Sequence, residues 1–229
     1  MVTKNQHIEL IVLRSETEQP GYRSGYFARP ANFIFEAGDW IDIQFEGRTL
    51  NGGITYSISS APTESDIRIT FREGISEFKK ALQSVQPNDR LFITQYGNDY
   101  NFQLKKNQSN VLIAGGVGIA PFRSMIKEMY DNDANVATTL IYLNQNDNFL
   151  FKDELDTWIK PLPNLSITYI PTKELNRKKR EKVLLSLIKN KNQNFYISGP
   201  PAMVESNEHL LIDAGVDVRN IRIDSFGGY

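Results

Sequence analysis

The first hundred residues contain short stretches in which apolar and polar side chains alternate, the pattern of half-buried β-strands. Within 41–45 and within 67–71, every second residue is apolar. We predict strands over 8–14, 26–35, 40–45, 55–60, 66–71 and 90–95. Short strands at this spacing indicate a small antiparallel barrel.

One amphipathic helix interrupts these strands, over residues 76–84. Its apolar stripe consists of Phe78, Ala81, Leu82 and Val85. Ser76 is expected to cap the N-terminus, and Lys79 and Lys80 are expected on the outer face.

The rest of the chain alternates strand and helix. We predict strands over 111–114, 138–143, 166–170, 194–198 and 221–226, and helices over 120–129, 152–159, 181–189 and 202–214. Continuously apolar runs such as 139–143 are typical of parallel strands covered on both faces. The change of pattern predicts two domains, 1–105 and 106–229, joined at the polar segment 105–110.

Composition narrows the possible partners. The 229 residues include 26 Lys and Arg, 27 Asp and Glu and no cysteine, for a net charge of −1. We therefore expect no general attraction to nucleic acid or anionic membrane, and no disulfide or cysteine-ligated cluster. Two histidines are too few to suggest a metal site. Because no segment resembles a signal peptide or a membrane span, a cytoplasmic location is expected.

Residues 111–121 combine a buried-type strand, a glycine turn and a helix start. Gly115, Gly116 and Gly118 let the backbone turn sharply and approach a ligand closely. Pro121 suits the first turn of the following helix. Such a turn is either a tight strand–helix connection or a seat for a dinucleotide pyrophosphate at the helix N-terminus.

Three further segments decide between these readings: Tyr56-Ser57-Ile58-Ser59-Ser60, residues 196–203 and residues 224–229. In this order, with the glycine turn, they resemble the ferredoxin–NADP reductase superfamily of flavin-dependent oxidoreductases over essentially the whole chain. The resemblance implies an antiparallel Greek-key β-barrel that binds flavin, followed by a doubly wound parallel α/β domain that binds a nicotinamide dinucleotide.

The resemblance also implies an activity. The protein would take a hydride from NAD(P)H onto bound FAD, with FMN less favoured. It would then pass electrons to a separate protein or small-molecule acceptor such as a ferredoxin, a flavodoxin, a haem protein or an oxygenase component. A flavin reductase that uses flavin as a dissociable substrate, and a non-catalytic electron-transfer or regulatory subunit, are the alternatives.

By the same resemblance, each motif supplies site residues. Those at the reacting centre are Ser57, Ser198, Asp224 and Phe226. Those at the flavin are Tyr56, Ser57, Ile58, Ser59, Gly74, Ile75, Ser76 and Phe226. Arg72 is added to the flavin residues as a hypothesis, because its charge is available for a flavin phosphate. Those at the nicotinamide coenzyme are Gly116, Val117, Gly118, Ile119, Pro121, Thr172, Lys173, Arg180, Gly199, Pro200 and Met203.

Several of these residues have a simpler interpretation. Ser76 can be an ordinary helix cap, and Phe226 can be a core residue of the last strand. The basic run 176–182 can be a solvated helix start. If its cations instead lie beside Thr172, they would favour binding of NADPH over NADH. Tyr229 is a candidate to stack on the flavin.

The chain departs from its relatives at two positions. Ser198 stands where many relatives have cysteine, and a hydroxyl still allows a hydrogen bond. Ile54 stands where relatives usually carry an arginine that pairs with a flavin phosphate. We expect weaker flavin binding as a result, unless Arg72 or Arg48 compensates.

Overall fold

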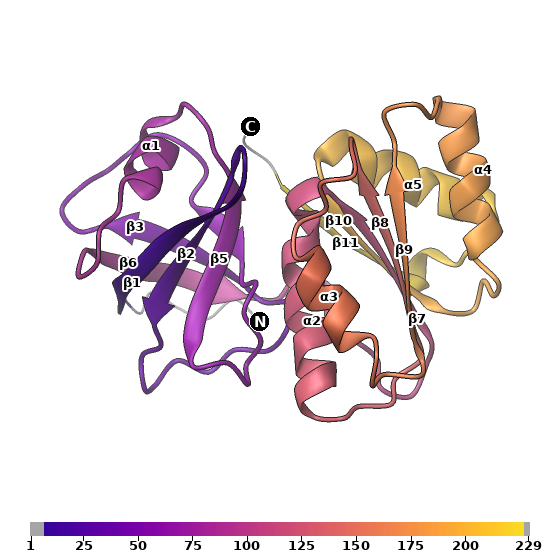
Figure 1. Ribbon diagram of the computed structural model, residues 1–229, viewed down its shortest axis with the longest axis horizontal. Helices are drawn as coiled ribbons and strands as arrows, with labels where there is room; N and C mark the ends of the chain where they lie inside the picture. Colours follow the sequence, from indigo (N-terminus) through magenta and orange to yellow (C-terminus); the bar gives the residue numbers. More distant parts are fainter. Residues whose placement is uncertain (1–6, 227–229) are drawn as a thin grey trace.

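The computed structural model describes residues 7–226, so that Tyr229 lies outside the described part. A six-stranded antiparallel sheet is followed by a five-stranded parallel sheet with helices on both faces (Figure 1). The antiparallel strands are β1 (Ile8–Gln19), β2 (Tyr22–Ala28), β3 (Trp40–Phe45), β4 (Thr55–Ser57), β5 (Asp66–Arg72) and β6 (Arg90–Gly97).

The antiparallel strands form a Greek-key barrel in the order β4-β3-β6-β1-β2-β5. An isolated bridge between Ile58 and Ile69 joins the two ends of this order. The first residues of β1 pair with β6 and its later residues pair with β2, with a register shift after Val12. Such an irregularity bends a strand and lets it turn a barrel corner. The predicted barrel is therefore confirmed.

A helix, α1 (Glu77–Gln83), covers one opening of the barrel core with its buried residues Phe78 and Leu82. Its predicted cap is confirmed, since the Ser76 Oγ accepts a hydrogen bond of 3.3 Å from the backbone N–H of Lys79. Lys80 is exposed, as predicted. Lys79 is partly buried, so the prediction that it lies on the outer face is wrong.

The second strand differs from its prediction. It spans Tyr22–Ala28 rather than 26–35, because Pro30 has no N–H to donate and opens a turn in which the Phe33 N–H bonds the Pro30 carbonyl. Phe33 and Phe35 are nevertheless buried in the barrel core. The predicted strand was therefore wrong for 29–35, although two of its apolar side chains are buried as a strand's would be.

The parallel sheet has the order β11-β10-β7-β8-β9. Its strands are β7 (Asn110–Gly115), β8 (Thr138–Asn144), β9 (Leu165–Pro171), β10 (Asn194–Gly199) and β11 (Ile221–Ser225). Its helices are α2 (Ile119–Asp131), α3 (Lys152–Trp158), α4 (Arg177–Leu187) and α5 (Pro201–Asp213). Figure 1 shows α2 and α3 on the side facing the barrel, and α4 and α5 on the opposite side. No helix within residues 7–226 is long and apolar enough to cross a membrane.

Residues of β7 alternate between the two faces of the sheet. Leu112 and Ala114 join the core beneath α2 and α3, whereas Val111 and Ile113 join the core beneath α4 and α5. The predicted double-sided burial is confirmed. Helix α4 starts earlier than predicted, at Arg177, because the Asn176 side chain caps it by accepting from the Lys179 N–H at 2.9 Å.

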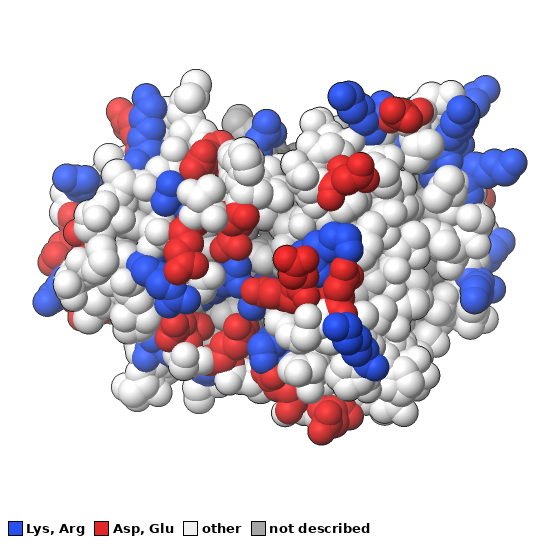
Figure 2. Space-filling model, viewed as in Figure 1, with Lys and Arg blue, Asp and Glu red and all other residues white. Residues whose placement is uncertain are grey.

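Two buried arginines hold the barrel against the parallel sheet. Arg123 of α2 and Arg68 of β5 are 3% and 4% exposed. Both bind Glu154 of α3, with Arg123 Nε at 2.6 Å and Arg68 Nη1 at 3.1 Å from its two carboxylate oxygens. Arg123 also binds Glu64 at 2.8 Å, and Arg68 binds Glu18 at 2.6 Å. Figure 2 shows acidic and basic side chains together along this junction.

Backbone and aromatic contacts complete this arginine junction. Arg123 Nη1 donates to the Ser59 carbonyl at 2.8 Å, and the Ser124 hydroxyl donates to the Ser60 carbonyl at 2.7 Å. The Phe151 ring lies within 4.6 Å of the Arg68 guanidinium and 5.4 Å of that of Arg123. Burial acts to raise the pKa of Glu154, but the two arginines outweigh it and hold that pKa below its ordinary value.

Removing Arg123 should therefore destabilise the fold. We expect Arg123→Gln to lower the free energy of unfolding by about 2–4 kcal/mol, because Glu64, Glu154 and the Ser59 carbonyl lose a shared partner. The control is Arg90→Gln, which breaks the exposed pair with Glu9 and should cost less than about 1 kcal/mol. Urea unfolding measures both, and equal losses would contradict the role of the junction.

Candidate active site

The glycine turn packs directly on the end of a neighbouring strand. A Cβ at Gly118 would lie 2.1 Å from the Ser198 carbonyl oxygen of β10, and a Cβ at Gly115 would lie 2.2 Å from the Met203 Cε. Gly116 adopts φ +54°, in the left-handed region. Glycines therefore bring the ends of β7 and β10 together, at the position where open parallel sheets form a ligand crevice.

A cleft of about 810 Å³ opens above this turn. Its walls come from the barrel, from the ends of β7 and β8, and from α4 and α5. They include Gln19, Tyr22, Arg72, Gly116, Val117, Asn144, Asn148, Thr172, Arg177, Arg180, Pro200, Met203 and Asn207. This volume lies within the range of clefts that hold cofactor-sized molecules.

Most residues predicted for the coenzyme lie at this cleft. Those that line it are Gly116, Val117, Thr172, Arg180, Pro200 and Met203. Gly118, Ile119 and Pro121 are buried behind it. Gly199 is also buried, and a Cβ there would lie 2.6 Å from the Met203 Cε. Lys173 was expected beside the coenzyme, but it is exposed and does not line the cleft.

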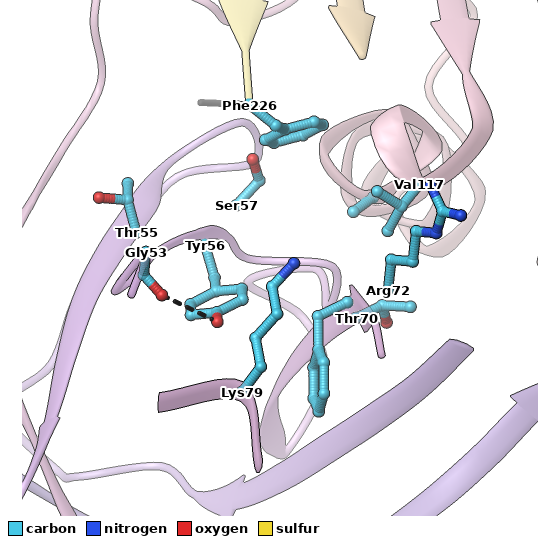
Figure 3. Close-up of a pocket in the computed structure, with 11 residues that line it drawn as sticks. Gly53, Thr55, Tyr56, Ser57, Thr70, Arg72, Lys79, Val117 and Phe226 are labelled. Atoms are coloured by element: carbon cyan, nitrogen blue, oxygen red, sulfur yellow. Dashed lines mark hydrogen bonds between the residues drawn. The ribbon is translucent and has the colours of Figure 1, made fainter. Parts of the chain in front are cut away.

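A second, smaller pocket adjoins the cleft. It is lined by Gly53, Thr55, Tyr56, Ser57, Thr70, Phe71, Arg72, Lys79, Val117, Ala120 and Phe226. Tyr56 and Phe226 lie on opposite sides of it, with Ser57 beside Phe226 (Figure 3). Tyr56 is positioned by a 3.1 Å hydrogen bond from its hydroxyl to the Gly53 carbonyl. Arg72 and Val117 line both spaces, so two ligands could lie next to each other here.

Three site residues meet where barrel and sheet come together. The Oδ2 of Asp224 accepts hydrogen bonds from the Ser57 hydroxyl at 2.9 Å and from the Ser198 hydroxyl at 3.2 Å. Burial raises the pKa of the Asp224 carboxyl to about 6; the two hydroxyls oppose this rise and the nearby charge of Asp99 adds to it. Residues far apart in the sequence thus form one polar group.

Other predicted residues turn their side chains elsewhere. Ile58 packs in the barrel core, and the Ser59 hydroxyl donates to the Arg68 carbonyl at 3.0 Å, so neither side chain faces the pocket. Ile75 is 88% exposed. Ser76 acts as the cap of α1, and neither Gly74 nor Ser76 lines the pocket.

The structure adds residues that sequence patterns did not indicate. Lys79 enters the smaller pocket, and Asn144 and Asn148 border the cleft. Lys79 was assigned to solvent because its neighbours Phe78 and Leu82 define the apolar stripe. A helical stripe identifies the core-facing residues, but not which flanking residue meets a cavity.

Comparisons with known proteins agree with this architecture. The sequence model of the family "Oxidoreductase NAD-binding domain" matches residues 112–209. The flavohemoprotein of Bacillus cereus is 27% identical over 84% of this chain and 53% of its own length. The toluate 1,2-dioxygenase electron transfer component of Pseudomonas putida is 25% identical over 84% of this chain and 59% of its own length.

Among solved structures, ferredoxin-NADP+ reductase from Plasmodium falciparum has the same fold, with a TM-score of 0.79 at 18% identity, over 96% of each chain. This shared fold is an antiparallel barrel followed by a parallel α/β domain. Residues 112–209 thus match the oxidoreductase NAD-binding domain family, and the whole described chain shares the fold of this reductase. It spans 53–59% of the length of the two sequence relatives named above.

The pKa of Asp224 predicts a pH-dependent stability. A carboxyl whose pKa is higher in the folded protein binds more protons there, so its contribution is lost as pH rises from 3.8 through about 6. Asp224→Asn should match the wild type near about pH 4 and exceed it by up to about 3 kcal/mol near about pH 8. Urea unfolding at the two pH values tests this. The exposed Asp213→Asn is the control, and parallel profiles for Asp224→Asn and wild type would contradict the assignment.

Proposed function

We propose that the protein is a flavin-dependent reductase that takes a hydride from NAD(P)H and passes electrons to a separate acceptor. The observation that carries this proposal is the junction of the two spaces at Arg72 and Val117, with Ser57, Ser198 and Asp224 beside it. A coenzyme in the cleft and a flat ring in the smaller pocket would meet at this point.

The smaller pocket fits a flavin in its chemistry. Tyr56 and Phe226 offer aromatic surfaces on opposite sides, Ser57 offers a hydroxyl, and Lys79 and Arg72 offer positive charge. FAD is favoured over FMN because the structural neighbours include a flavohemoglobin with bound FAD. A bound flavin supplies the ability to accept two electrons as a hydride and to release them one at a time.

Protein groups would position the reactants and exclude water. Val117 and Phe226 cover the junction with apolar surface, and Ser198 lies fully buried below it. Asp224 holds both serine hydroxyls in place. No general acid or base is needed for the hydride step, so we assign Ser57, Ser198 and Asp224 orienting and polarising roles.

The acceptor is proposed from relatives. The Pseudomonas putida relative is named an electron transfer component of a dioxygenase, and the Bacillus cereus relative is named a flavohemoprotein. An oxygenase component or a haem protein is therefore the acceptor class that the comparisons favour, with a ferredoxin or flavodoxin next.

A second candidate function is a flavin reductase with a dissociable flavin. The observation that favours it is Ile54, whose side chain packs against the barrel core and brings no charge to the flavin pocket. Arg48 is exposed on the turn after β3 and lines neither space, so it does not compensate there.

An absorbance spectrum of the purified protein, followed by anaerobic titration with NADPH and NADH, tests the main proposal. We expect about one flavin per chain after dialysis and loss of the flavin absorbance on addition of coenzyme. A colourless protein that oxidises NAD(P)H only with added flavin would favour the second function. No oxidation with any artificial acceptor would favour a docking subunit.

Coenzyme preference depends on α4, whose basic side chains lie at the right edge of Figure 2. Arg177 pairs with Glu181 at 2.6 Å, whereas within residues 7–226 no carboxylate pairs with Arg180. Arg180 therefore supplies the available charge for a 2′-phosphate, which supports a preference for NADPH.

We expect Arg180→Gln to raise the KM for NADPH by about tenfold or more and to change that for NADH less than about twofold, since only NADPH carries the 2′-phosphate. Steady-state kinetics with an artificial acceptor measure both constants. Lys182→Gln on the exposed side of the same helix is the control and should change neither. Equal effects of Arg180→Gln on the two coenzymes would rule out this role.

A further inference from the structure

Lys79 extends from α1 into the smaller pocket. Its ammonium group points into the space between Tyr56 and Phe226 in Figure 3. The side chain crosses the loop before the helix closely, because a Cβ at Gly74 would lie 2.7 Å from the Lys79 Cδ. The Gly74 carbonyl is held by the Gln83 side chain at 2.8 Å. The pocket is thus shaped to hold the lysine in this direction.

A second cation lines the same pocket. Arg72 reaches it from the end of β5, on the side of Val117 (Figure 3). Burial lowers the pKa of the Lys79 ammonium, and the positive charge of Arg72 lowers it further. An anion bound at this pocket would be attracted by both cations.

The pocket therefore has two kinds of surface. Tyr56 and Phe226 provide aromatic faces, and Lys79 and Arg72 provide charge. A ligand that matches both is a flat ring carrying a phosphate. Position 54 contributes only apolar contact with the barrel core.

Resting on the proposed function, we propose that Lys79, together with Arg72, binds the phosphate of the flavin. The two cations differ in the spaces that they line. Lys79 lines the smaller pocket and not the coenzyme cleft, whereas Arg72 lines both. Lys79 is thus specific to the flavin phosphate, and Arg72 serves both ligands.

The experiment compares flavins with and without a phosphate. The full chain, freed of flavin, is titrated with FAD and with riboflavin, and the dissociation constants are read from flavin fluorescence. We expect Lys79→Gln to weaken FAD binding by about 10- to 100-fold and riboflavin binding by less than about twofold. Lys79→Arg keeps the charge and should bind FAD within about threefold of wild type.

The matched control is Lys80→Gln, the exposed neighbour on the same helix, which should change neither constant. Circular dichroism verifies that each variant is folded. FAD binding by Lys79→Gln equal to wild type, or an equal loss for FAD and riboflavin, would overturn the assignment of Lys79 alone. If the wild-type chain binds neither flavin, the proposed function itself fails and this inference fails with it.

Discussion

The arginine junction between barrel and sheet is the constraint on which the site depends. Ser57 belongs to the barrel, whereas Ser198 and Asp224 belong to the parallel sheet. Both serine hydroxyls nevertheless lie within 3.2 Å of the same carboxylate oxygen of Asp224. Hydrogen bonds of this length tolerate displacements of only a few tenths of an ångström. Arg123 and Arg68 supply the rigidity, because each is buried and shares Glu154. A buried network of this kind specifies one arrangement when all of its members are paired.

The parts of the candidate site differ in their charged groups. The carboxyl of Asp224 is held by two hydroxyls, at a pKa of about 6, where the two halves meet. Lys79 and Arg72 bring positive charge to the smaller pocket, and Arg180 brings it to the cleft. With a net charge of −1, the chain has little overall charge, so attraction of the proposed anionic ligands would depend on these local cations.

Periodicity predicted most of the elements, because alternation and helical stripes report burial directly. It failed where burial and secondary structure separate, as at Phe33 and Phe35, which are buried in a loop after Pro30. It also failed for a side chain beside a helical stripe, since Lys79 was expected on the outer face and lines a pocket instead. Arg68 and Thr70 alternate with apolar neighbours on β5 as a solvent-facing row would, yet both are buried, because β5 contributes to the junction between barrel and sheet.

The sequence alone determined the strand–helix order and the glycine turn. These follow from local rules: glycine permits the turn at Gly116, and an unbroken apolar run such as β7 needs cover on both faces. The tertiary structure decided which residues meet. The contact of Ser57 with Asp224, the pairing of Arg68 with Glu154 and the entry of Lys79 into the pocket depend on how the barrel lies against the sheet. Packing between distant segments sets that arrangement, and no local pattern along the chain encodes it.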